Sequence, residues 1–416
     1  MIEVLRVGAY RKLFTAQVVA LLGTGLLTVA LGLLAFDLAG GQAGAVLGTA
    51  LTIKMLAYVF VAPVMAALVE RLPRKAVLVV ADLVRAGVAV MLPFIDQVWQ
   101  IYVLVFVLQA ASATFTPAFQ ALIPVVLPKE KDYTRALSLS RLAYDLESLL
   151  SPVLAAALLT VMSYSNLFIG TVAGFLLSAL MVVTTRLPGV SLTKPTGSLL
   201  HRTTLGTRIF LREPSLRGLM ALNLVVACGT ALVLVNTVVY VRDLFGGSNS
   251  EVAVALACYG AGSMVVALSA PALLDRISDR SMMMVGAMVV TAGVAAAAIV
   301  AAVEPSWLFL LTVWVLLGAG TSMINTPSAR LLRRAATDET RSYLFTAQFS
   351  LSHACFIIGY PVAGWVGAAA GQTAAAVVLA VLATLSTLAA YRLWPRRQAM
   401  QGADGEWPAT VSEKDR

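Results

Sequence analysis

The stretch Ala66-Ala-Leu-Val-Glu-Arg-Leu-Pro-Arg-Lys75 lies between two long apolar runs, and a related stretch, Pro271-Ala-Leu-Leu-Asp-Arg-Ile-Ser-Asp-Arg280, lies between two others. Both place an acid–arginine pair after a leucine and add another basic residue four or five positions after the acid. The match falls in polar loops, where shared apolar composition does not explain it. The two stretches therefore predict an internal repeat.

Prolines recur in the same way. Thr116-Pro117 stands 35 residues before Ser151-Pro152, and Thr326-Pro327 stands 34 residues before Tyr360-Pro361. Matching positions lie 205 to 210 residues apart throughout. We therefore expect two related halves, arranged as in transporters that move two repeats around a site at the middle of the membrane.

The composition indicates a membrane protein. Apolar residues make up 59% of the 416 residues and charged residues 12%, and the mean hydropathy is +0.87. A soluble domain carries about 25% charged residues, and disordered chains are poor in apolar residues. Because the apolar runs are continuous and do not alternate with polar residues, a β-barrel is excluded. The predicted fold class is an all-α membrane protein.

Twelve apolar runs reach the roughly 20 residues that a membrane-spanning helix needs. They lie near 13–36, 44–68, 76–97, 99–122, 137–162, 165–186, 216–240, 249–272, 281–303, 306–326, 341–367 and 372–394. The predicted organisation is an N-terminal six-helix bundle, a cytoplasmic linker with a surface helix near 199–212, a C-terminal six-helix bundle and a polar tail. These parts cover 1–186, 187–215, 216–394 and 395–416.

The basic residues set the orientation. If the N-terminus lies in the cytoplasm, all but four of the 30 Lys and Arg residues fall in cytoplasmic loops and tails. Arg242 lies on the opposite side, and Lys54, Arg85 and Arg141 lie inside spans. Cytoplasmic loops of membrane proteins carry such an excess, so both termini are expected in the cytoplasm. The net charge of +9 is explained in this way without nucleic acid as a partner.

The loop after the second run resembles the signature of the major facilitator superfamily, Gly-x-Leu-x-Asp-Arg-x-x-Arg-Arg. The matching residues are Ala66, Leu68, Glu70, Arg71, Arg74 and Lys75, so alanine replaces the glycine and glutamate the aspartate. The resemblance covers the whole chain and implies twelve spans in two pseudo-symmetric bundles. Within the superfamily the chain looks like exporters of drugs, siderophores or nickel. Residues 135–147 are similar to nickel-resistance members, which often end in a histidine-rich tail, whereas residues 395–416 contain no histidine.

Ionisable residues inside spans are costly and indicate functional sites. Six occur, all in the first half: Lys54, Asp82, Arg85, Arg141, Asp145 and Glu147. At about 1.5 Å per helical residue, Lys54, Glu147 and His353 lie about 15 Å deep in a core about 30 Å thick. Arg141 and Asp145 share a helix face and can pair with each other. Glu147 points elsewhere, with Lys54 as its first candidate partner and His353 as the second.

These positions suggest three sets of roles. Proton coupling is assigned to Glu147 first and to Asp145 second. Substrate binding is assigned to Lys54, Arg141, Tyr144, Gln109, Asn223, Asn236, Gln348 and His353. Gating near the cytoplasm is assigned to Glu70, Arg71, Arg74, Lys75, Asp82, Arg85, Asp275 and Arg276, as the resemblance implies for the loop motif. Structural ion pairing and helix packing are the alternatives for Arg141, Asp145 and the uncharged residues.

The sequence lacks a phosphate-binding Gly-x-x-x-x-Gly-Lys-Ser/Thr loop and the zinc helix His-Glu-x-x-His, so no enzyme activity, cofactor or metal site is expected. The leading hypothesis is a proton-coupled secondary exporter of a drug, siderophore or metal chelate in a bacterial-type inner membrane. Efflux of Ni²⁺ or Co²⁺ is the first alternative, nutrient uptake another, and a membrane receptor or enzyme a third. One chain contains both halves, so a monomer suffices.

Overall fold

A computed structural model of the chain describes residues 2–61, 73–186, 199–302, 306–336 and 341–394. These residues form helices and connecting turns, without a strand. The long helices of the first part are α1 (Gly8–Ala39), α2 (Ala43–Leu56), α4 (Arg74–Met91), α5 (Val98–Val126), α6 (Glu130–Leu159) and α7 (Ser165–Thr184). Those of the second part are α8 (Leu199–Arg212), α9 (Pro214–Val239), α10 (Asn249–Leu274), α11 (Asp279–Ala302), α12 (Trp307–Ala335), α13 (Arg341–Pro361) and α14 (Gly367–Leu393).

Short segments connect or extend these helices. They are η1 (Ile2–Arg6), η2 (Gly40–Gln42) and η4 (Leu92–Phe94), which are 3₁₀ turns, and η3 (Ala57–Val61), η5 (Tyr240–Leu244) and η6 (Val362–Val366), which are π-helical. Gly40 ends α1 with φ of +53°, a conformation that strongly favours glycine. Pro214 stands in the first turn of α9, where its missing N–H costs no hydrogen bond.

The expected membrane protein is confirmed. Among the described residues, nine stretches are long and apolar enough to cross a membrane. Two of them, Gly8–Val61 and Ala347–Leu393, each contain two consecutive long helices. Helix α6 contributes a shorter apolar segment, Leu150–Leu159, among the described residues.

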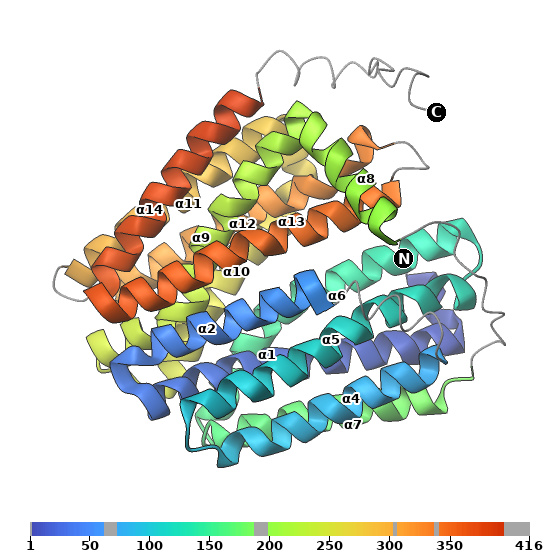
Figure 1. Cartoon of the computed structure of the whole chain (residues 1–416), viewed down its shortest axis with the longest axis horizontal. Helices are drawn as coiled ribbons and strands as arrows, with labels where there is room; N and C mark the ends of the chain where they lie inside the picture. Colours follow the sequence, from blue (N-terminus) through green and yellow to red (C-terminus); the bar gives the residue numbers. More distant parts are fainter. Residues whose placement is uncertain (1, 62–72, 187–198, 303–305, 337–340, 395–416) are drawn as a thin grey trace.

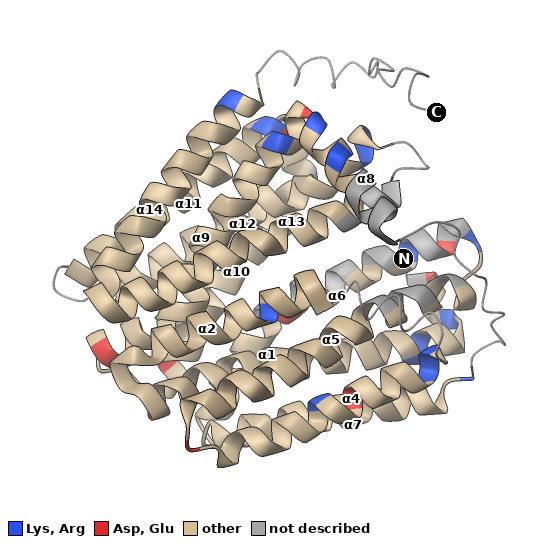
Figure 2. Ribbon diagram, viewed as in Figure 1, with Lys and Arg blue, Asp and Glu red and all other residues tan. Residues whose placement is uncertain are grey.

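The helices form two bundles that diverge toward one end (Figure 1). The N-terminal bundle contains α1, α2 and α4–α7, and the C-terminal bundle contains α9–α14. Figure 2 shows that Lys and Arg gather at the end that carries the N-terminus and α8. We call this the basic end and the opposite end the far end. Arg242, in η5, is the one described Lys or Arg at the far end.

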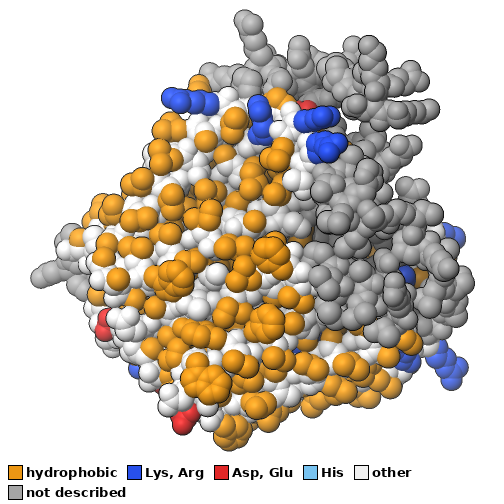
Figure 3. Space-filling view, in the orientation of Figure 1, with side chains coloured by type: hydrophobic (Ala, Val, Ile, Leu, Met, Phe, Trp, Pro, Cys, Tyr) orange, Lys and Arg blue, Asp and Glu red, His pale blue; other side chains and the backbone are white. Residues whose placement is uncertain are grey.

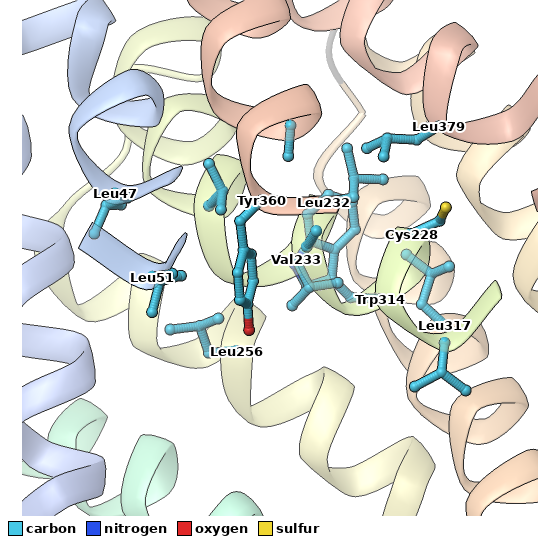
Figure 4. Close-up of a cluster of buried hydrophobic side chains, with 14 of the residues drawn as sticks. Leu47, Leu51, Cys228, Leu232, Val233, Leu256, Trp314, Leu317, Tyr360 and Leu379 are labelled. Carbon is cyan, nitrogen blue, oxygen red and sulfur yellow. The ribbon is translucent and has the colours of Figure 1, made fainter. Parts of the chain in front are cut away.

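Apolar side chains cover the visible outer face between these ends (Figure 3), as expected for a surface in contact with lipid. Among the described residues, the exposed apolar side chains include Leu268 and Phe60, which are 74% and 62% exposed. The buried core includes a contact between the bundles, in which Leu51 of α2 lies near Tyr360 of α13 and Leu256 of α10 (Figure 4).

The bundles contact each other at the far end. The indole N–H of Trp365 donates to the hydroxyl of Thr49 over 2.9 Å, and the amide of Gln42 donates to the carbonyl of Ala368 over 3.3 Å. The Arg242 guanidinium lies 5.3 Å from the centre of the Phe36 ring. These contacts join the N-terminal bundle to the C-terminal bundle and close the far end.

Candidate functional site

The site begins with two opposite charges that face each other across the N-terminal bundle. Lys54 lies in α2 and Glu147 in the middle of α6, and each is close enough to act on the other electrostatically. Gly25 of α1 provides room for the acid, because a Cβ at Gly25 would lie 2.8 Å from Glu147 Oε1. The structure therefore brings together the pair that the sequence predicts.

Aromatic side chains from both bundles surround Lys54. Its ammonium lies 5.7 Å from the centre of the Tyr58 ring, which meets the His353 ring edge-on at 5.5 Å. The His353 ring centre lies 4.1 Å from that of Phe349 with the two rings tilted by 34°, and the His353 Nδ1 lies 2.7 Å from the Phe349 carbonyl oxygen. Lys54 also acts electrostatically on His353. Lys54 thus acts on both Glu147 and His353, so the three residues expected at one depth lie in one region of the structure.

Sequence reasoning missed the aromatic part of this cluster. Phe349, His353, Phe356 and Tyr360 follow one another at helical spacing in α13, with ring centres of neighbours 4.1 to 6.5 Å apart. Residues three and four apart share a helix face, so this spacing was a readable signal. Tyr58 had no such signal, because a single aromatic residue in an apolar run is equally common on a lipid-facing side.

Tyr144 and Gln109 lie in the N-terminal bundle. Tyr144 lies near Thr116 and Gln17, and 38% of the residue is exposed. Ser140 donates to Gln17 over 2.9 Å. Gln109 is buried in α5. The side chains of Arg141 and Asp145 lie outside the described residues, so their expected pair and roles stay predictions.

The polar candidates of the C-terminal bundle separate into two groups. The amides of Asn223 and Gln348 exchange two hydrogen bonds of 3.2 Å and join α9 to α13. Asn236 is fully buried, and its amide donates to the Ala363 carbonyl over 3.0 Å and to Gln372. This residue therefore ties α9 to η6 and α14 at the far end, and the structure does not place it with Lys54.

Asp82 and Arg85, two of the expected gating residues, lie in α4. They form a buried ion pair inside the N-terminal bundle, and the Ser178 hydroxyl donates to Asp82 over 2.7 Å. The Arg85 guanidinium lies 4.4 Å and 4.6 Å from the ring centres of Phe115 and Phe175. These partners belong to α4, α5 and α7; Glu70 and Arg71 of the loop lie outside the described residues, so the expected network with them stays a prediction.

The other gating candidates that the structure describes lie at or near the basic end. Lys75, near the start of α4, donates to the Thr185 carbonyl over 3.0 Å, and Arg74 precedes it. Glu70 and Arg71 lie outside the described residues. Asp275 and Arg276 are exposed in the turn before α11, and their expected role in latching the two halves stays a prediction.

Asp279 of α11 joins helices at this end of the C-terminal bundle. It is buried and pairs with Arg330 at 3.2 Å and with Arg334 at 2.7 Å. Sequence reasoning missed it because Asp279 lies four residues beyond the acid that matches the loop motif. No group of His, Cys, Asp and Glu among the described side chains is arranged to hold a metal ion.

Some contacts inside the N-terminal bundle have an equivalent inside the C-terminal bundle, at the interval of the sequence repeat. Gln17 and Ser140 join α1 to α6 as Asn223 and Gln348 join α9 to α13. Lys75 binds a carbonyl at the end of α7, and Arg280 binds the Trp394 carbonyl at the end of α14 over 2.7 Å.

Comparison with known proteins agrees with this architecture. A nucleoside transporter, NupG, superposes with a TM-score of 0.69 at 15% identity, covering 92% of this chain and 98% of that one. A bacterial homolog of the lysosomal transporter Spinster gives 0.72 at 12% identity over 96% and 98%. A POT family transporter gives 0.70 at 11% identity over 91% and 95%. At these identities the likeness shows the fold alone.

Sequence relatives cover shorter regions. Macrolide efflux protein A of Streptococcus pyogenes is 25% identical over 184 residues, which are 43% of this chain and 45% of that protein. The protein of the same name from Enterococcus faecalis is 26% identical over 152 residues, 34% and 47% respectively. The match thus spans less than half the length of each relative.

The family itself is shown by the whole sequence. Residues 13–246 and 219–414 each match the Major Facilitator Superfamily. The overlapping matches cover nearly all of the chain and agree with the two bundles. The chain is a multi-pass membrane protein and a transporter, not an enzyme, and it belongs to the Major Facilitator Superfamily.

Proposed function

We propose that this transporter is a proton-coupled exporter of small, lipophilic drug-like molecules, with twelve spans and both termini in the cytoplasm. The basic end is then the cytoplasmic end, and the far end faces outward. The observation that carries the proposal is the Lys54–Glu147 pair, which lies beside aromatic rings from both bundles. Such a site combines a titratable acid with a surface for apolar substrates.

The charge pair suggests how protons are coupled to transport. With Glu147 ionised, its attraction to Lys54 holds α6 and α2 together at the centre of the bundle. A proton on Glu147 removes that attraction and leaves a net positive charge beside His353 of α13. Because α13 belongs to the other bundle, the change in charge alters the contact between the two bundles, as alternating access requires.

The aromatic side chains suggest the substrate class. Tyr58, Phe349, His353 and Phe356 offer ring faces and edges, and few fixed charges stand beside them. Macrolides, which the names of the sequence relatives mention, are lipophilic drugs whose apolar parts suit such a surface. We therefore propose a macrolide or a similar lipophilic drug, with a siderophore or metal chelate as the second candidate. Tyr144 and Gln109 are proposed to contribute hydrogen bonds.

Glu147→Gln tests the coupling. In proteoliposomes with erythromycin as the probe, we expect the variant to keep exchange of substrate without a gradient and to lose acceleration by an imposed pH gradient. Asp243→Asn is the matched control, because Asp243 is exposed at the far end and its carboxyl does not face Lys54. Full gradient-driven export by Glu147→Gln would refute the assignment.

A susceptibility screen tests the substrate. A deletion strain and an overexpressing strain are compared on macrolides, chelators and divalent metals. We expect the tolerance of macrolides to change. A change confined to Ni²⁺ and Co²⁺ would instead support the alternative of metal efflux.

A further inference from the structure

Four exposed arginines lie at the basic end of the C-terminal bundle. Arg208 and Arg212 lie one turn apart in α8, Arg217 lies in the first turn of α9, and Arg392 lies in the last turn of α14. We call these four residues the arginine cluster. Figure 3 shows that Lys and Arg side chains gather here, at the edge of the apolar outer face.

The three helices that carry the cluster adjoin one another at this end. The chain passes directly from α8 into α9 at Glu213. A Cβ at Gly218, the residue after Arg217, would lie 2.8 Å from the Cβ of Trp394, which stands two residues after Arg392. The cluster therefore spans neighbouring helix ends and not distant parts of the surface.

The cluster has no partner within the described part of the chain. None of its four guanidinium groups takes part there in a hydrogen bond or an ion pair. Other arginines at this end are used differently, since Arg330 and Arg334 pair with Asp279. The carboxylate of Glu213 accepts from the Ser215 hydroxyl over 3.2 Å. The cluster is thus an excess of positive charge that is available to a ligand.

Exposed apolar side chains lead up to the cluster along the outer face of α14. Four of them follow at intervals of three or four residues, share one helix face and are 51–59% exposed: Val381, Leu385, Leu388 and Tyr391. Arg392 follows Tyr391 directly. On α8, the residue before Arg212 is Leu211, which is 49% exposed. Tyrosines and basic residues at the end of an apolar face are typical of the membrane–water boundary.

Positive charge beside an apolar surface matches a ligand that has both an anionic group and apolar chains. We propose that the arginine cluster binds the headgroup of an anionic phospholipid, with the acyl chains along the outer face of α14. Guanidinium groups suit this ligand because they donate two parallel hydrogen bonds to phosphate oxygens. Basic pockets between cytoplasmic helix ends are typical sites for such headgroups. The site does not depend on what the transporter carries.

Native mass spectrometry of the purified full chain tests the site. The protein in neutral detergent is titrated with dioleoylphosphatidylglycerol or dioleoylphosphatidylcholine, and the complexes give the Kd of the first bound lipid. We expect phosphatidylglycerol to bind at least about tenfold more tightly, because each basic residue near an anionic lipid adds several-fold. Changing all four arginines of the cluster to glutamine is expected to abolish that difference and to leave the Kd of phosphatidylcholine within about twofold. Equal affinities of the wild type for both lipids would overturn the proposal.

A matched control separates the site from the net charge. It removes four exposed basic residues at the same end of the N-terminal bundle, in the variant Arg6→Gln/Arg11→Gln/Lys129→Gln/Arg186→Gln. We expect this control to keep the Kd of phosphatidylglycerol within about twofold of the wild type. An equal loss of affinity in both variants would show attraction to net charge alone and overturn the proposal. Lysine at all four positions of the cluster keeps the charge but not the paired hydrogen bonds, and is expected to weaken binding about threefold.

Two further measurements complete the test. Glycerol phosphate carries the anionic group without acyl chains and is expected not to displace phosphatidylglycerol; displacement at equal concentration would indicate a soluble phosphate ligand and overturn the lipid assignment. Because basic residues set the orientation in the membrane, loss of four can prevent correct insertion. In that case Arg217→Gln/Arg392→Gln decides: we expect at least about threefold weaker binding of phosphatidylglycerol, and an unchanged Kd would overturn the proposal.

Discussion

The close approach of α2 to the C-terminal bundle gives a prediction for Gly48→Ala. A Cβ at Gly48 would lie 2.6 Å from the Tyr360 carbonyl oxygen and 3.0 Å from the Cα of Gly364. Both are backbone atoms, so neither can rotate away. Ordinary contact begins near 3.4 Å, and the far ends must therefore separate by about 0.8 Å.

That separation has a further cost. It stretches the 2.9 Å bond between Trp365 and Thr49 to about 3.7 Å, which is beyond hydrogen-bonding range. Overpacking costs about 1–3 kcal/mol, and the lost hydrogen bond adds about 1 kcal/mol. A total of at least about 2 kcal/mol shifts the balance between closed and open far ends by about 30-fold.

Spin labels measure this shift. Phe94 and Ser248 are exposed at the far ends of the two bundles, and a double electron–electron resonance experiment gives the distance between labels placed there. We expect Gly48→Ala to increase the population with the longer distance. Gly87→Ala is the matched control, because a Cβ at Gly87 has no neighbour within 4 Å. A distance distribution identical to that of the wild type would refute the reasoning.

Two further substitutions test contacts within the C-terminal bundle. Asn223→Ala leaves the partly buried amide of Gln348 without its partner and is expected to lower the free energy of unfolding by about 1–2 kcal/mol; thermal unfolding of the purified protein measures it, and an unchanged midpoint would contradict the role of the amide pair. Asp279→Asn removes two ion pairs to arginines that are 36% and 41% exposed, so the expected loss is at most about 1 kcal/mol. This loss is expected to fade in 1 M salt, where charges are screened within about 3 Å; a loss independent of salt would contradict it.

The depth of a residue could be read from the sequence because the rise of a helix is constant. Counting from the ends of the apolar runs brings Lys54, Glu147 and His353 to one level, and the structure places them together. The same counting does not give the rotation of a helix about its axis. Asn236 was therefore expected to line a cavity, although its amide donates hydrogen bonds to Ala363 and Gln372.

Contacts between residues far apart in the chain were the other feature that the sequence could not reveal. Asp82 and Arg85 are three residues apart, so their pairing was within reach of the sequence. Their enclosure by Phe115, Phe175 and Ser178 depends on how α4 packs against α5 and α7. Apolar runs are too uniform to specify such packing, and the pair was therefore assigned to the nearest charges in sequence.

The internal repeat separates packing from function within one molecule. Contacts that occur in both bundles, such as those of Lys75 and Arg280 with the ends of α7 and α14, serve what the bundles share, which is holding six helices together. Charges that occur in one bundle alone cannot be required for that. At the positions equivalent to Asp82 and Arg85, 205 residues farther along the chain, the C-terminal bundle has Ala287 and Val290. At the interval of 208 residues that relates Ser140 to Gln348, the position equivalent to Glu147 is Cys355. If these unrepeated charges serve transport, making the N-terminal bundle neutral at 82, 85 and 147 should leave a folded protein that no longer responds to a pH gradient.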